Sequence, residues 1–430
     1  MVVYNLAYLV SNMKTEIIVI GNELLSGKTR DLNGWYASGR LLSNGIEVSE
    51  IRTVGDDHKS LSSVLKTAAG RSDFIIVTGG LGPTEDDLTT ETVSKTFGRP
   101  LMLYNDILHT IREFTRKAGM KPSASLERLA WLPEGAKILD QKKQMCGFSL
   151  IEGKSLLYFL PGVPEQMREL LDRSVIPDIF RIFTPKNLLK QRLIKVYGLR
   201  EAGIADAFKG LSKEFPGVMF GFYPSFPENH INITARGNKD ARTEKILNST
   251  EEKIKEILGP YVFASNDMSM EAVAGELLKG HRKTISVAES CTGGLIGHRL
   301  TSVPGSSAYF ERGAIVYSNR SKIEMLGVKQ STLDRYGAVS HQVSREMAEG
   351  IRKTSKTDMG LAVTGIAGPS GGEKNKPVGT VFIGLSVDNK IFSSHYLFSG
   401  TREKVKIHTS EMALDWVRRY MHGYPFIPGI

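Results

Sequence analysis

The 430-residue sequence predicts an α/β protein of three domains, and three observations support this. Strand-like and helix-like segments alternate over the first hundred residues, which is typical of a parallel sheet with helices on both faces. The composition changes between about residues 183 and 264, and a second strand–turn–helix pattern begins near residue 284. We therefore expect domains over 13–182, 183–264 and 268–422.

Composition limits the class of protein. The 41% hydrophobic and 24% charged residues are typical of a globular protein, and no apolar run approaches the roughly 20 residues that span a bilayer. Two cysteines, Cys146 and Cys291, provide no disulfide framework and indicate a cytoplasmic protein. Residues 1–10 lack the basic region and cleavage site of a signal peptide, and both Met1 and Met13 are candidate start residues.

The net charge of +10 suits ligands that carry phosphate. The basic residues are spread along the chain instead of forming a tail, so nucleic acid is an unlikely partner.

The first domain shows the alternation most clearly. We expect strands at 16–20, 48–54 and 73–78, with helices at 32–42 and 58–69. In such sheets ligands bind beyond the carboxyl ends of the strands.

Two loops at those ends carry polar residues, one over 21–27 and the other over 79–87. The glycines of the second loop let the backbone approach a phosphate. Glu23, Asp86 and Asp87 could hold a hard divalent cation through carboxylate oxygens. Alternatively, the acidic residues of the second loop simply open the next helix, where negative charge is favoured. Both readings stay open at this point.

The middle segment predicts a small α+β unit. Strands are expected at 193–197 and 230–235, and helices at 201–211 and 243–258.

The third domain is organised around a small-residue turn over 289–294. A short, half β-branched run at 284–288 predicts a buried strand before it, and 295–301 predicts a helix after it. Ser290 in such a turn is a candidate nucleophile, and the glycines allow backbone N–H groups to hold an oxyanion or a phosphate. The alternative is an ordinary serine or threonine cap with a glycine turn.

Longer motifs resemble a known family. Residues 23–25, 54–57, 79–87 and 161–165 are similar to the molybdopterin-binding-like domain of the CinA family. The resemblance implies a metal-dependent ADP-ribose pyrophosphatase that uses a divalent metal of the Mg or Co type together with K. Asp86 and Asp87 would be the metal ligands. The implied nucleotide and metal residues are Glu23, Asn33, Gly80, Gly82, Thr84, Asp86 and Asp87.

One loop departs from the family pattern. The family has Asn-Pro-x-Gly-Thr-Ala-Pro-Gly where residues 140–147 read Asp-Gln-Lys-Lys-Gln-Met-Cys-Gly. The replacements remove the smooth backbone surface on which a ligand would lie, which argues against the implied hydrolase activity and leaves open whether this domain retains it. Cys146, in this loop, is expected to be a packing thiol.

The middle segment resembles the KH-like domain of full-length CinA proteins. A nucleic-acid-binding KH module needs a Gly-x-x-Gly loop, which 183–264 lacks. We therefore expect a spacer and packing module.

The last segment resembles the CinA carboxy-terminal domain, a nicotinamide-nucleotide amidase of the PncC type. The motifs at 289–294, 317–319, 322, 363–369, 379–381 and 400–402 occur in order. The resemblance implies hydrolysis of nicotinamide mononucleotide (NMN) to nicotinate mononucleotide and ammonia, in pyridine nucleotide salvage. It also implies a homodimer and no cofactor for the amidase. The alternative is a non-catalytic scaffold that binds pterin or nucleotide and is linked to competence.

The residues allow a consistent mechanism for hydrolysing a carboxamide. The domain has neither a His-Glu-x-x-His motif nor a Gly-x-Ser-x-Gly elbow, which leaves a serine–lysine arrangement. Ser290 would attack, Lys322 would accept its proton, and Tyr317 could relay a proton or orient the ring. The alternatives are a solvated lysine and a half-buried tyrosine. Cys291 is a competing nucleophile that we expect to be structural.

The substrate would be held by the loops around this pair. Arg402 suits a phosphate, Thr364 adds a hydroxyl to the catalytic group, and Glu289 either anchors its turn or binds the ribose hydroxyls. The expected substrate-binding residues are Glu289, Thr292, Gly293, Gly294, Asn319, Gly365, Ala367, Gly368, Thr380 and Arg402.

Overall fold

The computed structural model describes residues 13–121, 123–140, 146–182, 188–237 and 241–429. The chain divides into two compact units. The first runs to residue 191 and includes 235–245, and the second contains 192–234 and everything from 246 onward. Within the described residues, no helix combines the length and the apolar character needed to cross a bilayer.

The first unit contains a six-stranded sheet with the order β2-β1-β3-β8-β7-β6. The three predicted strands, β2, β1 and β3, are parallel as expected; β8, which was not predicted, continues the parallel part, and β7 and β6 are antiparallel additions at one edge. The strands are β1 (Thr15–Ile20), β2 (Val48–Val54), β3 (Phe74–Thr78), β6 (Lys137–Ile138), β7 (Phe148–Glu152) and β8 (Ser155–Leu160).

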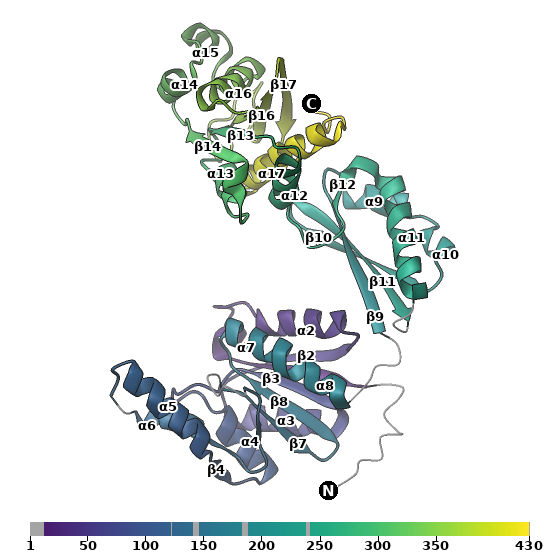
Figure 1. The fold of residues 1–430 in the computed structure, drawn as a ribbon, viewed down its shortest axis with the longest axis vertical. Coiled ribbons are helices and arrows are strands. Elements are labelled where there is room, and N and C mark those ends of the chain that lie inside the picture. The colour runs from purple at the N-terminus through teal and green to yellow at the C-terminus, as the bar shows by residue number, and fades with distance from the viewer. Residues whose placement is uncertain (1–12, 122, 141–145, 183–187, 238–240, 430) are drawn as a thin grey trace. The chain divides into compact units, whose positions relative to one another are not determined.

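Helices cover both faces of this sheet (Figure 1), and β1 shows why. Successive side chains of a strand point to opposite faces. Ile17 and Val19 pack in one core with α2 and α7, and Ile18 and Ile20 pack in another with α3 and α4. The helices of the sheet are α1 (Asn22–Leu25), α2 (Asn33–Ser43), α3 (His58–Arg71), α4 (Thr89–Phe97), α7 (Pro164–Leu170), η3 (Leu171–Val175) and α8 (Ile176–Ile182).

A small lobe is inserted between α4 and the antiparallel strands. It consists of β4 (Leu101–Leu103) paired with β5 (Trp131–Pro133), α5 (Asn105–Lys117), α6 (Ala124–Glu127) and η2 (Arg128–Ala130). Most of the loop that departs from the family pattern, 141–145, lies outside the described residues. At its end, burial raises the pKa of the Cys146 thiol to about 11, as expected for a packing thiol.

The middle module is a four-stranded sheet, with the order β10-β11-β9-β12, and its helices. The single helix predicted over 201–211 is two, because Gly210 adopts a left-handed φ of 89° between them. Strand β10 was not predicted. The elements are β9 (Leu188–Val196), α9 (Glu201–Ala207), α10 (Leu211–Glu214), β10 (Val218–Ser225), β11 (Glu228–Gly237), α11 (Ala241–Leu258), η4 (Gly259–Tyr261) and β12 (Val262–Ala264).

The carboxy-terminal module contains a five-stranded sheet with the order β14-β13-β15-β16-β17. Strand β13 runs parallel to β14 and β15, so the carboxyl ends of these three strands meet at one edge. The strands are β13 (Ile285–Glu289), β14 (Phe310–Ile315), β15 (Met359–Gly365), β16 (Thr380–Val387) and β17 (Lys390–Leu397).

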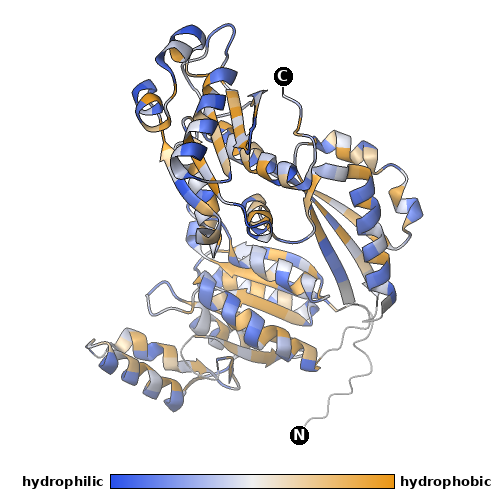
Figure 2. Cartoon of the chain, turned by 45° about the horizontal axis from the view of Figure 1, so that its top comes forward, coloured by the Kyte–Doolittle hydropathy of each residue, from blue (hydrophilic) through white to orange (hydrophobic). Residues whose placement is uncertain are grey.

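Two cores lie on either side of this sheet. Ile285 and Val287 of β13 face the core shared with α12, α13 and α17, and Ala288 faces the core shared with α14, α15 and α16. Figure 2 shows apolar residues concentrated on the strands. The helices are α12 (Met270–Gly280), α13 (Leu295–Thr301), η5 (Ser306–Ala308), α14 (Asn319–Leu326), α15 (Gln330–Tyr336), α16 (His341–Ser355) and α17 (Arg402–His422).

Candidate active site

The predicted nucleophile lies at the carboxyl edge of the last sheet. Ser290 directly follows β13, and its backbone N–H donates to the carbonyl of Val363 in β15 at 3.1 Å. The next turn needs glycine, because Gly293 and Gly294 have left-handed φ angles of 63° and 96°. Ser290 is 7% exposed, so the hydroxyl sits in a largely desolvated position.

The structure brings Lys322 to this serine. The Lys322 Nζ lies 3.0 Å from the Ser290 Oγ, 2.8 Å from the Val316 carbonyl oxygen and 3.2 Å from the Tyr317 carbonyl oxygen. All three oxygens are uncharged, and Lys322 is 1% exposed. Burial lowers the pKa of the Lys322 amine to about 8, because desolvation disfavours the ammonium form. The lysine is therefore buried, and the alternative of a solvated side chain is wrong.

Glu289 anchors the turn. Its carboxylate accepts hydrogen bonds from the backbone N–H groups of Gly294, Ile296 and Gly297 at 3.0, 3.1 and 2.8 Å. The residue is 1% exposed, so of the two predicted roles the structure shows the anchor and not the ribose contact. These three N–H groups at the start of α13 are therefore used by the protein itself.

Cys291 is placed as a structural residue. It is 4% exposed, and burial raises the pKa of its thiol to about 12. A thiol that stays protonated at neutral pH is a poor nucleophile. Thr292, predicted as a substrate contact, is fully buried beside it.

Arg402, Tyr317 and Gly368 converge from three separate segments. The Arg402 guanidinium donates to the Gly368 carbonyl at 2.8 Å and to the Tyr317 hydroxyl at 3.0 Å. Tyr317 is 62% exposed, so the alternative of a half-buried tyrosine is wrong. Its hydroxyl meets Arg402, whereas its carbonyl meets Lys322. Both acceptors of Arg402 are uncharged, which leaves the charge of the guanidinium uncompensated by these contacts.

Other predicted residues form the framework around the site. Thr364 is 1% exposed and its hydroxyl donates to the Ala338 carbonyl at 2.9 Å, which is a packing bond and not the expected catalytic contact. A Cβ at Gly365 would lie 2.7 Å from the Thr380 carbonyl oxygen, so glycine is required there. Ala367 and Thr380 are buried, and Asn319 is exposed at the start of α14.

Sequence reasoning missed Lys406, because no pattern links one helical lysine to a turn far away in the chain. Its Nζ lies 3.8 Å from where a Cβ on Gly293 would be, one helical turn after Arg402.

In the first unit, several of the predicted nucleotide and metal residues are engaged in hydrogen bonds with the protein. The Asn33 side chain donates to the Thr78 hydroxyl at 3.0 Å and to the Gly162 carbonyl at 2.8 Å. Asp87 accepts from the Thr84 N–H and hydroxyl at 2.9 and 2.6 Å. The acidic residues of this loop do not open a helix, because α4 begins only at Thr89.

The carboxylates of this loop share one edge of the sheet with Asp56. Burial, followed by the charges of Glu23, Asp86 and Asp87, raises the pKa of Asp56. Among the residues that the structure describes, no three His, Cys, Asp or Glu side chains are placed to hold a metal ion. The side chains as arranged do not fit the implied metal, which stays a prediction, and we route no reaction step through it.

A cavity of about 990 Å³ adjoins this loop. Gly80, Gly82 and Asp87 form one side, and apolar side chains of α5 such as Ile111 and Phe114 form another. The α5 residues were not predicted to belong to a site, although their helical spacing could have indicated an apolar face.

The comparisons with known proteins follow the same three divisions. Family models match residues 16–181 (probable molybdopterin binding domain), 191–264 (damage-inducible protein CinA KH domain) and 267–421 (CinA C-terminal domain). A CinA-like protein of Geotalea uraniireducens is 39% identical over 408 residues, which cover 95% of this chain and 97% of the relative. The chain belongs to the CinA family.

A second full-length relative supports this assignment, and a solved structure resembles part of the chain. A putative competence-damage inducible protein of Thermoanaerobacter pseudethanolicus is 39% identical over 415 residues, covering 96% of this chain and 99% of the relative. The solved structure of competence/damage inducible protein CihA from Agrobacterium tumefaciens covers 36% of this chain and 99% of its own, at 36% identity and a TM-score of 0.35.

Proposed function

We propose that this CinA protein hydrolyses the carboxamide of NMN to nicotinate mononucleotide and ammonia. One observation carries the proposal: the buried amine of Lys322 lies 3.0 Å from the hydroxyl of Ser290. A serine is a weak nucleophile unless an adjacent base accepts its proton. With a pKa of about 8, about a tenth of Lys322 is neutral at pH 7 and can act as that base, far more than for an unshifted lysine.

The reaction proceeds in two halves. The Ser290 Oγ attacks the amide carbon and its proton moves to the Lys322 Nζ, which forms a tetrahedral intermediate. The resulting ammonium then gives the proton to the leaving nitrogen, the C–N bond breaks, and ammonia departs from an acyl-serine. A water molecule, deprotonated by Lys322, attacks the ester carbon and releases the carboxylate while the proton returns to Ser290. The turn over 291–293 supplies backbone N–H groups for the oxyanion.

The exposed arginine binds the other end of the substrate. Arg402 is held by Tyr317 and Gly368 through uncharged oxygens, so its charge remains for a phosphate. Guanidinium and phosphate form paired charge-assisted hydrogen bonds. The mononucleotide would then span from Ser290 to Arg402.

The test measures ammonia release from NMN by the wild type and by Ser290→Ala. We expect turnover in the wild type and none above background in the variant. The matched control is Ser331→Ala, which changes an exposed serine of α15. Turnover that survives Ser290→Ala would remove the serine mechanism. A folded wild type that releases no ammonia, yet retains DNA in a salt-sensitive way, would favour the non-catalytic scaffold.

A second function is favoured by the cavity beside the glycine loop of the first unit. Its size suits a nucleotide, and Gly80 and Gly82 allow the backbone to approach a phosphate. We propose that this cavity binds ADP-ribose. Calorimetry with ADP-ribose, with and without Mg²⁺, tests the proposal. Phe114→Ala should weaken binding at least about tenfold if the base or ribose packs on α5. Equal binding by both proteins would reject this location.

A further inference from the structure

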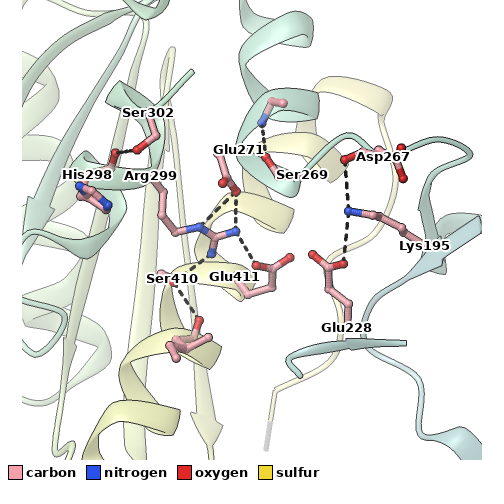
Figure 3. A network of polar contacts seen from close by, with 12 residues as sticks. Lys195, Glu228, Asp267, Ser269, Glu271, His298, Arg299, Ser302, Ser410 and Glu411 are labelled. Atoms are coloured by element: carbon pink, nitrogen blue, oxygen red, sulfur yellow. Dashed lines mark hydrogen bonds and ion pairs between the residues drawn. The ribbon is translucent and has the colours of Figure 1, made fainter. Parts of the chain in front are cut away.

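Helix α13 follows the turn that contains Ser290, and Arg299 lies in the last helical turn of α13. The Arg299 Nη2 lies 2.6 Å from a carboxylate oxygen of Glu271 and 2.6 Å from one of Glu411. Its Nη1 donates to the Ser410 hydroxyl at 3.0 Å. Glu271 belongs to α12, and Ser410 and Glu411 belong to α17, so one guanidinium joins three helices (Figure 3).

Both ends of this junction lead to the candidate active site. On one side, the turn that contains Ser290 is fixed to the start of α13, because the Glu289 carboxylate accepts hydrogen bonds from three N–H groups there. On the other side, Arg402 lies on the same continuous helix as Glu411. At 1.5 Å per residue the two are about 14 Å apart along the helix axis.

We propose that Arg299 is a positioning residue for the amidase reaction. By holding α13 against α17 through Ser410 and Glu411, it sets the separation between Ser290 and Arg402. The inference rests on the proposed function, since one substrate must reach both residues, with its carboxamide at Ser290 and its phosphate at Arg402. A displacement of about 1 Å at a reacting centre can cost about a hundredfold in rate.

Glu411 lies among several charged groups. It faces Arg299 of α13, Glu271 of α12 and Glu228 of β11 in the middle module, and Figure 3 shows the Glu228 and Glu411 carboxylates turned toward each other. Glu228 itself pairs with Lys195 at 3.8 Å and with His230 at 2.7 Å. The buried Tyr197 also senses the charge of Glu411.

This arrangement makes the junction sensitive to pH. Glu411 is 1% exposed, and its Oε1 has no hydrogen-bond partner among the described residues. Burial raises its pKa to about 7; Arg299 opposes this shift, and Glu228 and Glu271 add to it. The raised pKa means that the fold accommodates the protonated carboxyl better than the ionised one, even with Arg299 beside it. Ionisation of Glu411 should therefore loosen the contact between α13 and α17 as pH rises through 7.

The first experiment compares Arg299→Lys with Arg419→Lys. Lysine keeps the charge of Arg299 but loses the fork that reaches three partners. Arg419 is another buried arginine of α17, and its guanidinium bonds Asp415 and the carbonyls of Pro425 and Pro260. We expect Arg299→Lys to raise the KM for NMN at least about tenfold, and Arg419→Lys to change it less than about threefold. Thermal unfolding confirms that both variants are folded.

The second experiment tests whether ionisation of Glu411 affects substrate binding, and it uses variants that change side-chain charge with little change of shape. In the wild type, the KM for NMN should rise as pH rises from about 6 to about 8, and Glu411→Gln should remove this change. Glu228→Gln removes a like charge and should move the inflection to lower pH.

The outcomes separate the two proposals. Three results would overturn the positioning role and leave the amidase in place. They are unchanged kinetics in Arg299→Lys, an equal rise of KM in Arg419→Lys, and a pH profile of KM that is the same in Glu411→Gln as in the wild type. A folded wild type without NMN turnover would overturn the proposed function and the positioning role with it.

Discussion

The Lys322 Nζ and the Ser290 Oγ lie 3.0 Å apart, although 32 residues separate them in the chain. Ser290 ends a strand and Lys322 sits in the first helical turns after the neighbouring strand, so the parallel pairing of β13 with β14 brings them together. The acceptors of the Lys322 hydrogen bonds are all uncharged oxygens. Its protonation state is therefore controlled by burial.

The first prediction concerns the pH dependence of ammonia release. Because the pKa of Lys322 is lowered to about 8, kcat/KM should rise as pH increases through about 8, where the neutral base becomes dominant. Lys322→Arg, which cannot lose its proton, should lower kcat at least about a thousandfold. A flat profile, or an active arginine variant, would show that Lys322 is not the base.

The second prediction separates the two candidate nucleophiles. The Cys291 thiol is buried and its pKa is raised to about 12, so Cys291→Ala should keep kcat within about threefold of the wild type. Steady-state ammonia release measures this, with Ser290→Ala as the inactive reference. Loss of turnover in a folded Cys291→Ala would transfer the nucleophile role to the thiol.

The third prediction concerns the anchor of the turn. The Glu289 carboxylate accepts hydrogen bonds from three backbone N–H groups. In Glu289→Gln, one of the two oxygens becomes an NH2 group, which faces at least one of these N–H groups and cannot accept from it. We expect the free energy of unfolding to fall by about 1–3 kcal/mol, with reduced turnover. Glu324→Gln, which removes an exposed ion pair with Arg320 on α14, should cost less than about 1 kcal/mol. Equal costs in urea unfolding would mean that Glu289 is not an anchor.

The fourth prediction is a pH dependence of stability from Glu411. Its pKa is about 7 in the folded protein and 4.5 in the unfolded chain, so the folded state binds its proton more tightly. The free energy of unfolding should therefore fall as pH rises between these values, by up to roughly 3 kcal/mol at about 1.4 kcal/mol per pH unit. Urea unfolding at pH values below and above this window measures the fall. Glu411→Gln should remove it; the same slope in both proteins would contradict the prediction.

The fifth prediction concerns the separation of the two sites. Asp86 lies in the first unit and Ser290 in the second, so Asp86→Ala should leave ammonia release within about twofold of the wild type. A chelator should likewise spare the amidase. A large loss in the folded variant, or inhibition by the chelator that added metal reverses, would show that the two sites depend on each other.

Much of the fold could be predicted because local patterns are strong. The continuous apolar runs that became β1 and β3 are buried on both faces, and the expected helices after β1 and β2 occur within two residues of their predicted bounds. Strands β6, β7 and β8 of the first sheet, and β10 and β12 of the middle module, were missed. Strand β10 is largely exposed, so it carries little hydrophobic periodicity.

The sequence by itself determined the residue types of the candidate site and the strand–turn–helix that presents Ser290, because glycine conformation and strand burial are local properties. Only the tertiary structure decided which polar groups face the site and which are used for packing. The tertiary structure brings the Lys322 amine next to the Ser290 hydroxyl. It also gives Glu289 and Thr364 backbone hydrogen-bond partners, and it links α13 to α17 through Arg299. The physical reason is that hydrogen bonding and desolvation depend on neighbours distant in the chain, and these neighbours set both the direction of a side chain and its pKa.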